Sequence, residues 1–445
     1  MQNFKKKILF VLILLLATPG IMFGEDSRKI EFTEFTLDNG LHVILQPDNT
    51  TPNIVVNIMY HVGAKNEHPD RTGFAHFFEH LMFEGTEHIG RGEFSEIVEE
   101  AGGSLNAFTS FDLTNYFIML PSNQLELGLW MESERMLHPV IDSVGIATQK
   151  DVVTEEMGET RDEPPYGRLM TETIDRAFTK HAYQTDVLGK EEHIRNATHE
   201  DIRAFHDMFY VPNNAALVIT GDIDIEDTKQ LVKKYFADIP KGEEEIYRPP
   251  RNEPDRTEEL RDTVYDNVQI PAIVQAYMIP ALGESDYYAV ELLGNLLTRG
   301  QSSRLHRRLV DEEEKALQVQ SMPLNMEHPG VNLVLAIANM DANPKEVEDI
   351  INEEFEKVRN ELISEKELQR LKNQVESQMI NSNTTISERA VNLANYHLLY
   401  EDTNLINTEL ERYMEVTRED ILRVAREYFN EDNRVVIYWL PKQES

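Results

Sequence analysis

The 445-residue sequence contains no cysteine. Disulfide bonds, a thiol nucleophile, thiolate metal sites and a lipid-modified N-terminal cysteine are therefore excluded. Because no oxidative cross-link can support the fold, its stability must come from packed cores, and 41% of the residues are apolar. Any transition metal must be held by histidine and carboxylate side chains.

Long apolar runs are also missing. The N-terminus reads MQNFKKKILFVLILLLATPGIMFGED, where three lysines precede the apolar run Ile8–Ala17. This run is well short of the ~20 residues that a membrane span needs. Small residues near Gly20 and Gly24 suit a signal peptidase, so residues 1–24 are predicted to be a signal peptide. We expect an exported protein with no stable membrane anchor after cleavage; a retained N-terminal anchor is the alternative.

Basic residues are scarce relative to acids: 43 Lys and Arg stand against 79 Asp and Glu, a formal charge of −36. Residues 1–24 hold three lysines and no acid, so cleavage would bring the charge to −39. Such a surface repels nucleic acid and anionic lipid, and it attracts basic peptides. Solubility explains the same charge equally well.

The length predicts two or three domains. Residues 29–238 alternate strand-like and helix-like segments, including a hairpin turn at residues 38–40. Residues 239–262, IPKGEEEIYRPPRNEPDRTEELRD, are rich in proline and charge and form the predicted linker. Residues 263–445 then repeat the earlier order of elements. We therefore predict an α+β fold with two similar domains, each a mainly antiparallel sheet with helices packed on one face.

One predicted helix, residues 73–84, contains the motif HFFEH. His76 and His80 are one helical turn apart, so both imidazoles can reach one ion, and Glu79 lies on nearly the same face. Two imidazoles bind zinc poorly without a further ligand, and a catalytic site adds a carboxylate and leaves one position for water. Two histidines at this spacing are also common as unrelated surface or core residues. The pattern H-x-x-E-H is the inverted zincin signature.

A third ligand must come from another segment. The predicted acidic helix at residues 149–163 offers four glutamates, and spacing does not choose among them: Glu155, Glu156, Glu159 and Glu163. A run of glutamates of this kind is also typical of a solvated helix face.

Several further segments carry a family resemblance. Five segments occur in the order typical of one family: HFFEH, GGSLNAFTSFDLTNYF (102–117), DVVTEEM (151–157), FYVPNNAALVITGDID (209–224) and GQSSRLHRRLV (300–310). The chain resembles the pitrilysin-insulinase metallopeptidases, which include the mitochondrial processing peptidase. The resemblance extends over nearly the whole chain after residue 24. It implies that residues 29–238 form a zinc-binding peptidase domain.

The resemblance also implies roles for individual residues. His76, His80 and Glu156 would bind one zinc ion (Zn²⁺) per chain, and Glu79 would be the general base that activates the zinc-bound water. Asn106 and Ala107 would belong to an edge strand that pairs with an extended peptide substrate. The alternative for these two residues is an ordinary edge strand.

Three positions depart from the family pattern. Gln149 stands where the family usually has a glutamate, seven residues before the third ligand. Val310 and Leu317 stand where active members have an Arg and a Tyr that hold the substrate carbonyl, so this stabilisation is missing here. Arg307 or Arg308 is a substitute only if the helix alignment slips.

In some bacterial members two half-length chains pair, one with zinc and the other with Arg and Tyr. The resemblance therefore implies a partner subunit of similar length that encloses a chamber with this chain; a homodimer is the alternative. The expected function is an exported zinc endopeptidase, periplasmic in the first place or secreted, acting on peptides or unfolded segments. A scaffold or chaperone-like subunit without turnover, and a zinc hydrolase with a non-peptide substrate, are the competing functions.

Overall fold

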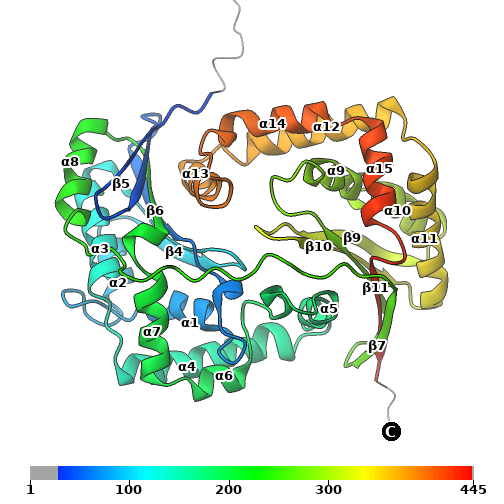
Figure 1. Cartoon of the computed structure of the whole chain (residues 1–445), viewed down its shortest axis with the longest axis horizontal. Coiled ribbons are helices and arrows are strands. Elements are labelled where there is room, and N and C mark those ends of the chain that lie inside the picture. Colours follow the sequence, from blue (N-terminus) through cyan, green and yellow to red (C-terminus); the bar gives the residue numbers. More distant parts are fainter. Residues whose placement is uncertain (1–28, 443–445) are drawn as a thin grey trace, which may run out of the picture.

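A computed structural model describes residues 29–442, so the predicted signal peptide lies outside the described residues. Two α+β units lie side by side in Figure 1, with the N-terminal unit in blue to green and the C-terminal unit in green to red. Within the described range, every helix is too short or too polar to cross a membrane.

The first unit is built on a six-stranded sheet of order β1-β2-β6-β3-β5-β4. Its strands are β1 Thr33–Thr36, β2 His42–Pro47, β3 Asn53–Tyr60, β4 Ser104–Thr109, β5 Thr114–Pro121 and β6 Ala215–Gly221. β2 and β6 run parallel, whereas all other neighbours are antiparallel. The predicted turn joins β1 to β2, and Gly40 adopts a φ of 90° there, which a residue with a Cβ rarely does. β4 is left at the edge of the sheet.

The second unit repeats this arrangement with the strand order β7-β11-β8-β10-β9. Its strands are β7 Leu260–Asp266, β8 Ala272–Ile279, β9 Ala316–Leu324, β10 Gly330–Ala338 and β11 Arg434–Pro441. Here β7 and β11 form the single parallel pair. Apart from β1, the two sheets have the same order and the same position of the parallel pair. The predicted α+β fold with two similar, mainly antiparallel units is confirmed.

The helices divide between the two units in chain order. The first unit contains α1 Phe74–Leu81, α2 Glu93–Glu100, α3 Leu125–Leu137, α4 Ser143–Met157, α5 Leu169–Ala177, α6 Glu191–Asn196, α7 His199–Phe209 and α8 Ile225–Phe236. The second contains α9 Tyr287–Thr298, α10 Arg304–His306, α11 Pro344–Asn360, α12 Glu365–Asn381, α13 Ile386–Tyr400, α14 Leu405–Glu415 and α15 Arg418–Tyr428. Short 3₁₀ turns are η2 Ala64–Asn66, η3 Ser122–Gln124, η5 Ala182–Gln184 and η6 Pro212–Asn214, and π-helical turns are η4 Gly158–Asp162 and η7 Arg307–Glu312.

The segment between α8 and β7 crosses the face of the molecule in an extended conformation (Figure 1). Hydrogen bonds of its polar side chains hold this segment in place. Arg248 donates to the backbone oxygen of His61 at 2.8 Å, and the Glu253 carboxylate accepts the backbone N–H groups of Thr179 and His181 at 2.7 and 2.8 Å. β7 begins at Leu260, inside the segment 239–262 that was expected to be linker. The boundaries at residues 238 and 263 stay predictions.

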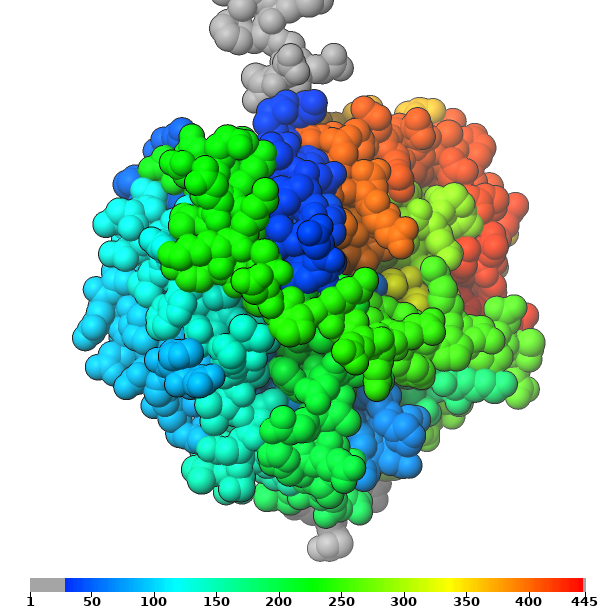
Figure 2. All heavy atoms as spheres, turned by 60° about the vertical axis from the view of Figure 1, so that its left-hand side comes forward, coloured from blue at the N-terminus to red at the C-terminus, as the bar shows by residue number. Residues whose placement is uncertain are grey.

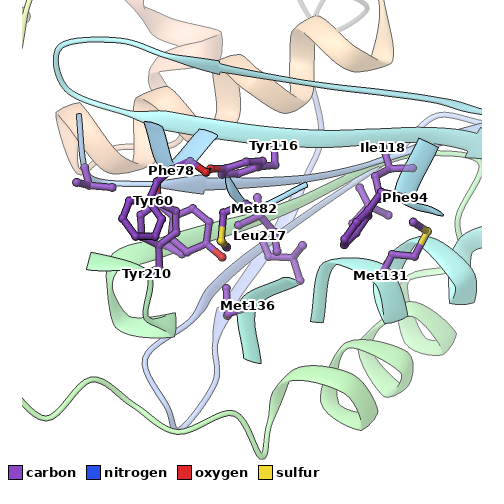
Figure 3. Close-up of a cluster of buried hydrophobic side chains, with 14 of the residues drawn as sticks. Tyr60, Phe78, Met82, Phe94, Tyr116, Ile118, Met131, Met136, Tyr210 and Leu217 are labelled. Atoms are coloured by element: carbon purple, nitrogen blue, oxygen red, sulfur yellow. The ribbon is translucent and has the colours of Figure 1, made fainter. Parts of the chain in front are cut away.

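Each sheet packs helices of its own unit against one face. In the first unit these are chiefly α1, α2, α3, α7 and α8, whose apolar side chains form one continuous core with the strands. Figure 3 shows part of this core, where Phe78 and Met82 lie beside Tyr60, Tyr116 and Tyr210. In the second unit α9, α11, α12 and α15 form the corresponding core.

The opposite face of each sheet is covered by a helix from the other unit. Ala390, Leu393 and Ala394 of α13 pack on Val55 and Met59 of the first sheet. In return, α5 of the first unit contributes to a core with the strands of the second sheet. This exchange has no counterpart in local sequence periodicity, which predicted one covered face only. It buries both faces of both sheets and makes the two units one body.

A network of buried charges also joins the units. The fully buried Lys65 ammonium donates to Asp112 Oδ1 at 2.8 Å and pairs with Glu327 of the second unit. His61 Nε2 lies 2.6 Å from the same Glu327 carboxylate, and Tyr183 donates to Asp112 at 2.5 Å. Burial alone would raise the pKa of Glu327, but the contacts with His61 and Lys65 hold this pKa well below its usual range.

This pKa predicts how stability depends on pH. A carboxylate with a lowered pKa in the folded state stabilises the protein above its unfolded pKa of about 4.3, and this contribution is lost as the pH falls through the folded pKa. At pH 7, Glu327→Gln should lower the free energy of unfolding by about 2–3 kcal/mol, because Lys65 loses one of its two carboxylates.

Urea unfolding at several pH values tests this prediction. The difference between wild type and Glu327→Gln should narrow below about pH 4. The exposed Glu258→Gln is the matched control and should stay within about 0.5 kcal/mol of wild type at all pH values. A difference that persists unchanged into strong acid would contradict the ionic role.

Candidate metal centre

The helix that carries HFFEH is fixed at its N-terminus by two features. Gly73 precedes α1 with a φ of 87°, and a Cβ at this position would lie 2.4 Å from the backbone oxygen of Leu188. The buried carboxylate of Glu67 accepts the N–H groups of Gly73 at 2.7 Å and Ala75 at 2.8 Å. These N–H groups have no partner inside the helix, so Glu67 supplies the missing acceptors.

The two faces of α1 differ in chemistry. Its apolar residues Phe74, Phe77, Phe78 and Leu81 are buried in the core of the first unit. The hydroxyl of Tyr116 donates to the backbone oxygen of Phe78 at 3.2 Å, at the position visible in Figure 3. Because the apolar face is held in the core, the motif's polar side chains are turned towards α4 and β4, two of the elements that contact the helix.

Three side chains converge beside α1. His76 Nε2 lies 3.6 Å from Glu156 Oε1, and His80 Nε2 lies 3.2 Å from Glu156 Oε2. The two imidazole rings meet edge to face, with their centroids 4.8 Å apart. Zinc bonds of about 2.0–2.1 Å in a tetrahedral site put ligand atoms about 3.4 Å from each other. Two nitrogens and a carboxylate at these separations fit one zinc ion.

The structure distinguishes among the four glutamates that the sequence offers. Glu156 is half-buried and faces the two imidazoles, whereas Glu155, Glu159 and Glu163 are exposed. Glu156 lies near the end of α4, two residues before Gly158, where the π-helical turn η4 begins. π-helical turns inside helices are frequent at functional sites.

Burial sets the protonation state of the first imidazole. His76 is only 7% exposed, and burial together with the neighbouring His80 lowers the pKa of His76 to about 4. Its ring is therefore neutral at pH 7 and its lone pair is free for a ligand bond. Nδ1 of the same ring is buried without a hydrogen-bond partner among residues 29–442.

Glu79 lies next to the cluster and is oriented by β4. The hydroxyl of Thr109 donates to Glu79 Oε2 at 2.7 Å. Burial raises the pKa of Glu79, while the hydrogen bond from Thr109 opposes that rise. A carboxylate of raised pKa is a better proton acceptor near neutral pH than an exposed one.

Asn106 and Ala107 lie on β4, in the strand that ends the first sheet and has one neighbour, β5. The outward Ala107 N–H is bonded by the side chain of its neighbour, since Asn106 Oδ1 accepts it at 2.8 Å. Thr109, which holds Glu79, lies on the same strand. An extended chain added to this edge would therefore run beside the Glu79 carboxylate.

Gln149 does not contact the imidazoles. Its amide donates to Glu84 at 2.5 Å, and Glu84 is also paired with Arg91. A glutamate at position 149 would place a second negative charge against Glu84, so glutamine suits this neighbour. The contact ties α4 to the segment that follows α1.

The other two positions that depart from the family pattern lie in the C-terminal unit. Val310 packs against the core of that unit, and Leu317 is half exposed on β9, the edge strand that corresponds to β4. Arg308 is engaged by three carboxylates, those of Glu313, Glu353 and Glu354. Arg308 is therefore not free to replace the arginine that position 310 lacks.

Comparison with known proteins places this chain in a family. The family model described as insulinase (peptidase family M16) matches residues 42–191, and that of the peptidase M16 inactive domain matches residues 196–375. The zinc protease PqqE of Helicobacter pylori is 30% identical over 99% of this chain and 100% of its own length. The chain belongs to the insulinase family of peptidases. The resemblance seen in the sequence is thus confirmed.

Solved structures agree with this membership. A protease from Helicobacter pylori matches with a TM-score of 0.88 and 30% identity, over 93% of this chain and 100% of that one. The periplasmic protease PqqL from Escherichia coli shares the fold at 18% identity and a TM-score of 0.75, with 92% of this chain covering 47% of that one. The present chain is thus about half as long as the PqqL chain in that structure.

Two residues that support the site were not predicted from the sequence. Glu67 and Thr109 act through contacts between segments that are distant in the chain. Glu67 belongs to no segment that the sequence analysis singled out, and Thr109 lies inside the segment 102–117 without an assigned role there. Thr109 lies two residues after Ala107 and therefore on the same face of β4, which gave only a weak signal for its contact with α1.

The role of Glu67 can be tested by its removal. Glu67→Ala would leave two buried N–H groups of α1 without an acceptor, so we expect a loss of about 2–4 kcal/mol in the free energy of unfolding. Glu163→Ala, which removes an exposed glutamate, should change it by less than about 0.5 kcal/mol. Urea denaturation followed by circular dichroism measures both, and equal midpoints for the two variants would refute the capping role.

Proposed function

We propose that this chain is a zinc-dependent endopeptidase, with His76, His80 and Glu156 as the ligands of one zinc ion and Glu79 as the general base. The convergence of the Glu156 carboxylate on the two imidazoles of α1, at 3.2 and 3.6 Å, carries the proposal. Membership of a peptidase family and similarity to proteins named zinc proteases support it.

The chain's own residues account for positioning and proton transfer. Zinc, when bound, supplies Lewis acidity that polarises a carbonyl and acidifies water. Glu79, held by Thr109, takes a proton from the attacking water and passes it to the leaving amine. His76 and His80 would hold the ion through their Nε2 atoms, and the buried face of α1 keeps their spacing fixed.

A peptide substrate fits the geometry better than a small molecule. β4 has free hydrogen-bonding capacity at the sheet edge, and its Thr109 contacts the proposed base. Backbone pairing along Asn106 and Ala107 would hold an extended peptide with little dependence on its side chains. Asn106 would release the Ala107 N–H to the incoming strand.

We further propose that a similar-length partner subunit provides the Arg and Tyr that Val310 and Leu317 replace, with a closed chamber between the two chains. The twofold greater length of the PqqL chain of the same fold supports this arrangement. The predicted signal peptide supports an exported location, for which we propose the periplasm in the first place and secretion as the alternative. The alternative, a scaffold subunit without turnover, is favoured by Val310 and Leu317 and opposed by the intact donor set around Glu79.

The assignment of the base predicts separate effects on metal and on turnover. Glu79→Gln should keep about one zinc in this centre and lower kcat at least 100-fold, since general-base catalysis contributes about 10²–10⁴. Glu156→Gln should lose both zinc and activity. Metal analysis and hydrolysis of a fluorogenic peptide measure these two properties, and wild-type hydrolysis by Glu79→Gln would overturn the assignment.

The partner proposal predicts that activity depends on a second chain. The purified protein alone should hydrolyse unfolded peptides at least about 100-fold more slowly than its mixture with the similar-length family member that carries Arg and Tyr seven residues apart, because a lost oxyanion donor costs that much. Heating the partner beforehand is the control. Full activity of this chain alone would remove the need for a partner.

A further inference from the structure

The chain just beyond Glu156 is held to a loop of the same unit by one arginine. Arg161 lies in the π-helical turn η4, and its side chain is only 13% exposed. Its guanidinium donates to the backbone oxygen of Gly189 at 2.6 Å and lies 3.5 Å from Asp186 Oδ1, while its Nε lies 3.0 Å from the exposed Asp162. Gly189 and Asp186 belong to the loop between η5 and α6. Arg161 thus joins the end of the ligand-bearing helix to this loop.

Asp186 holds the loop together from inside. Its Oδ1 accepts the backbone N–H of Gly189 at 2.8 Å, and its other oxygen accepts the hydroxyl of Thr171 in α5. Gly189 has a φ of 70°, a conformation that residues with a Cβ rarely adopt. Arg161 therefore contacts both the carboxylate and a carbonyl of one tight turn, so it holds the whole turn and not a single flexible side chain.

The same loop packs on the start of α1, backbone against backbone. A Cβ at Gly189 would lie 2.3 Å from the backbone nitrogen of Gly73, and a Cβ at Gly73 would lie 2.4 Å from the backbone oxygen of Leu188. Lys190 donates its N–H to the hydroxyl of Thr72 at 3.1 Å. Figure 2 shows the neighbouring surface, where the blue segment before α1 lies against the green segments that contain α6 and α7. A shift of the loop must therefore move the start of α1 relative to α4.

These contacts connect one proposed metal ligand to another. His76 is in the first turn of α1, at the end of the helix that the loop touches. Glu156 is two residues before the turn that carries Arg161. The separation of 3.6 Å between His76 Nε2 and Glu156 Oε1 depends on where the end of α4 lies against the start of α1. The contact of Arg161 with the loop fixes that relation.

The charge of Arg161 also keeps the loop in its place. Asp186 is only 8% exposed, and among residues 29–442 Arg161 is its one basic partner within 4 Å. Burial raises the pKa of Glu67, the cap of α1, and the negative charge of Asp186 adds to this rise, so the two carboxyl groups are close. A buried carboxylate that loses its cation is costly and turns towards water. Without Arg161, the loop would move away from α1.

We propose that Arg161 is a positioning residue for the metal centre, which sets the place of Glu156 relative to His76 through the loop 186–189. This inference rests on the proposed function, because it takes Glu156 and His76 as ligands of one zinc ion. Residues that orient a ligand without touching the ion commonly change metal affinity about 10- to 100-fold. The competing interpretation is an ion pair that stabilises the fold without any effect on the centre.

Zinc affinity of the full chain tests the role. Arg161→Met keeps the apolar stem and removes the donors, so it should weaken zinc binding about 10- to 100-fold. Arg195→Met is the matched control, because Arg195 also pairs with α4, through Asp151 at 3.6 Å, but is half exposed; it should stay within about 3-fold of wild type. Competition with a chelating dye measures both variants. Wild-type affinity in Arg161→Met would overturn the proposal.

A spectroscopic measurement separates positioning from stability alone. With Co²⁺ in the centre, the visible absorption of the saturated protein depends on the geometry of the ligands. Arg161→Met should change these bands even when every site is filled, because the carboxylate of Glu156 is displaced. Weaker binding together with a wild-type spectrum would reduce Arg161 to a stabilising contact and contradict the proposal.

Asp186→Asn provides a second variant, which also serves if Arg161→Met does not fold. It keeps the oxygen that accepts the Gly189 N–H and removes the charge that holds Arg161, so zinc binding should weaken at least about 3-fold. The double variant should lose no more than Arg161→Met alone, since both changes act through one contact. Wild-type affinity in Asp186→Asn, or fully additive losses, would refute the shared role.

The outcomes also separate this inference from the assignment of the ligands. A wild-type chain that binds no zinc would reject the ligand assignment and this inference together. Zinc binding that is lost in Glu156→Gln but unchanged in Arg161→Met would reject the inference alone and leave the proposed function intact.

Discussion

Each sheet of this protein has two apolar faces, and each unit supplies its own helices to one of them. An uncovered face would expose the side chains of Val55, Met59 and Val218 to water, each of which contributes about 1.5–3 kcal/mol when fully buried. The exchange of α13 and α5 solves this problem for both sheets at once. The two units therefore cannot move apart as independent domains without exposing both cores.

Polar contacts follow from this exchange. The same packing that brings α13 to the first sheet places His397 over His42, and the packing of α5 brings Tyr183 to Asp112 near Lys65. Lys65 belongs to the turn immediately before Glu67, which holds the N-terminus of α1. The position of α1, which carries the proposed ligands His76 and His80, thus depends on the junction between units as well as on its own apolar face.

The sequence predicted what local pattern determines. The alternation of strand-like and helix-like segments predicted the two α+β units. The spacing of His76 and His80 predicted that both lie on one face of a helix. The acidic helix was expected from residue 149, but α4 begins at Ser143, where Asp142 caps it through Val144 and Gly145. The cap was missed because the stretch before Gln149 is apolar, although an Asp such as Asp142 is an ordinary signal for the start of a helix.

Contacts between distant segments were beyond the reach of periodicity. Spacing left four glutamates as equal candidates for the third ligand, because the choice depends on how α4 lies against α1. Only Glu156 faces the rings, whereas the other three candidate glutamates are exposed. Likewise, His42 belongs to an ordinary hairpin in the sequence, and its stacking partner His397 is more than 350 residues away.

The two edge strands differ in a way that bears on the proposed partner subunit. β4 and β9 occupy equivalent positions in the two sheets, but Thr109 of β4 supports the Glu79 carboxylate, whereas β9 carries the half-exposed Leu317. Selection on a pure scaffold has no physical reason to keep a buried neutral imidazole, a second imidazole and a carboxylate at ligand distance, because unpaired polar groups there cost stability. An intact donor set beside an incomplete second unit therefore supports the proposed partner subunit over the scaffold alternative.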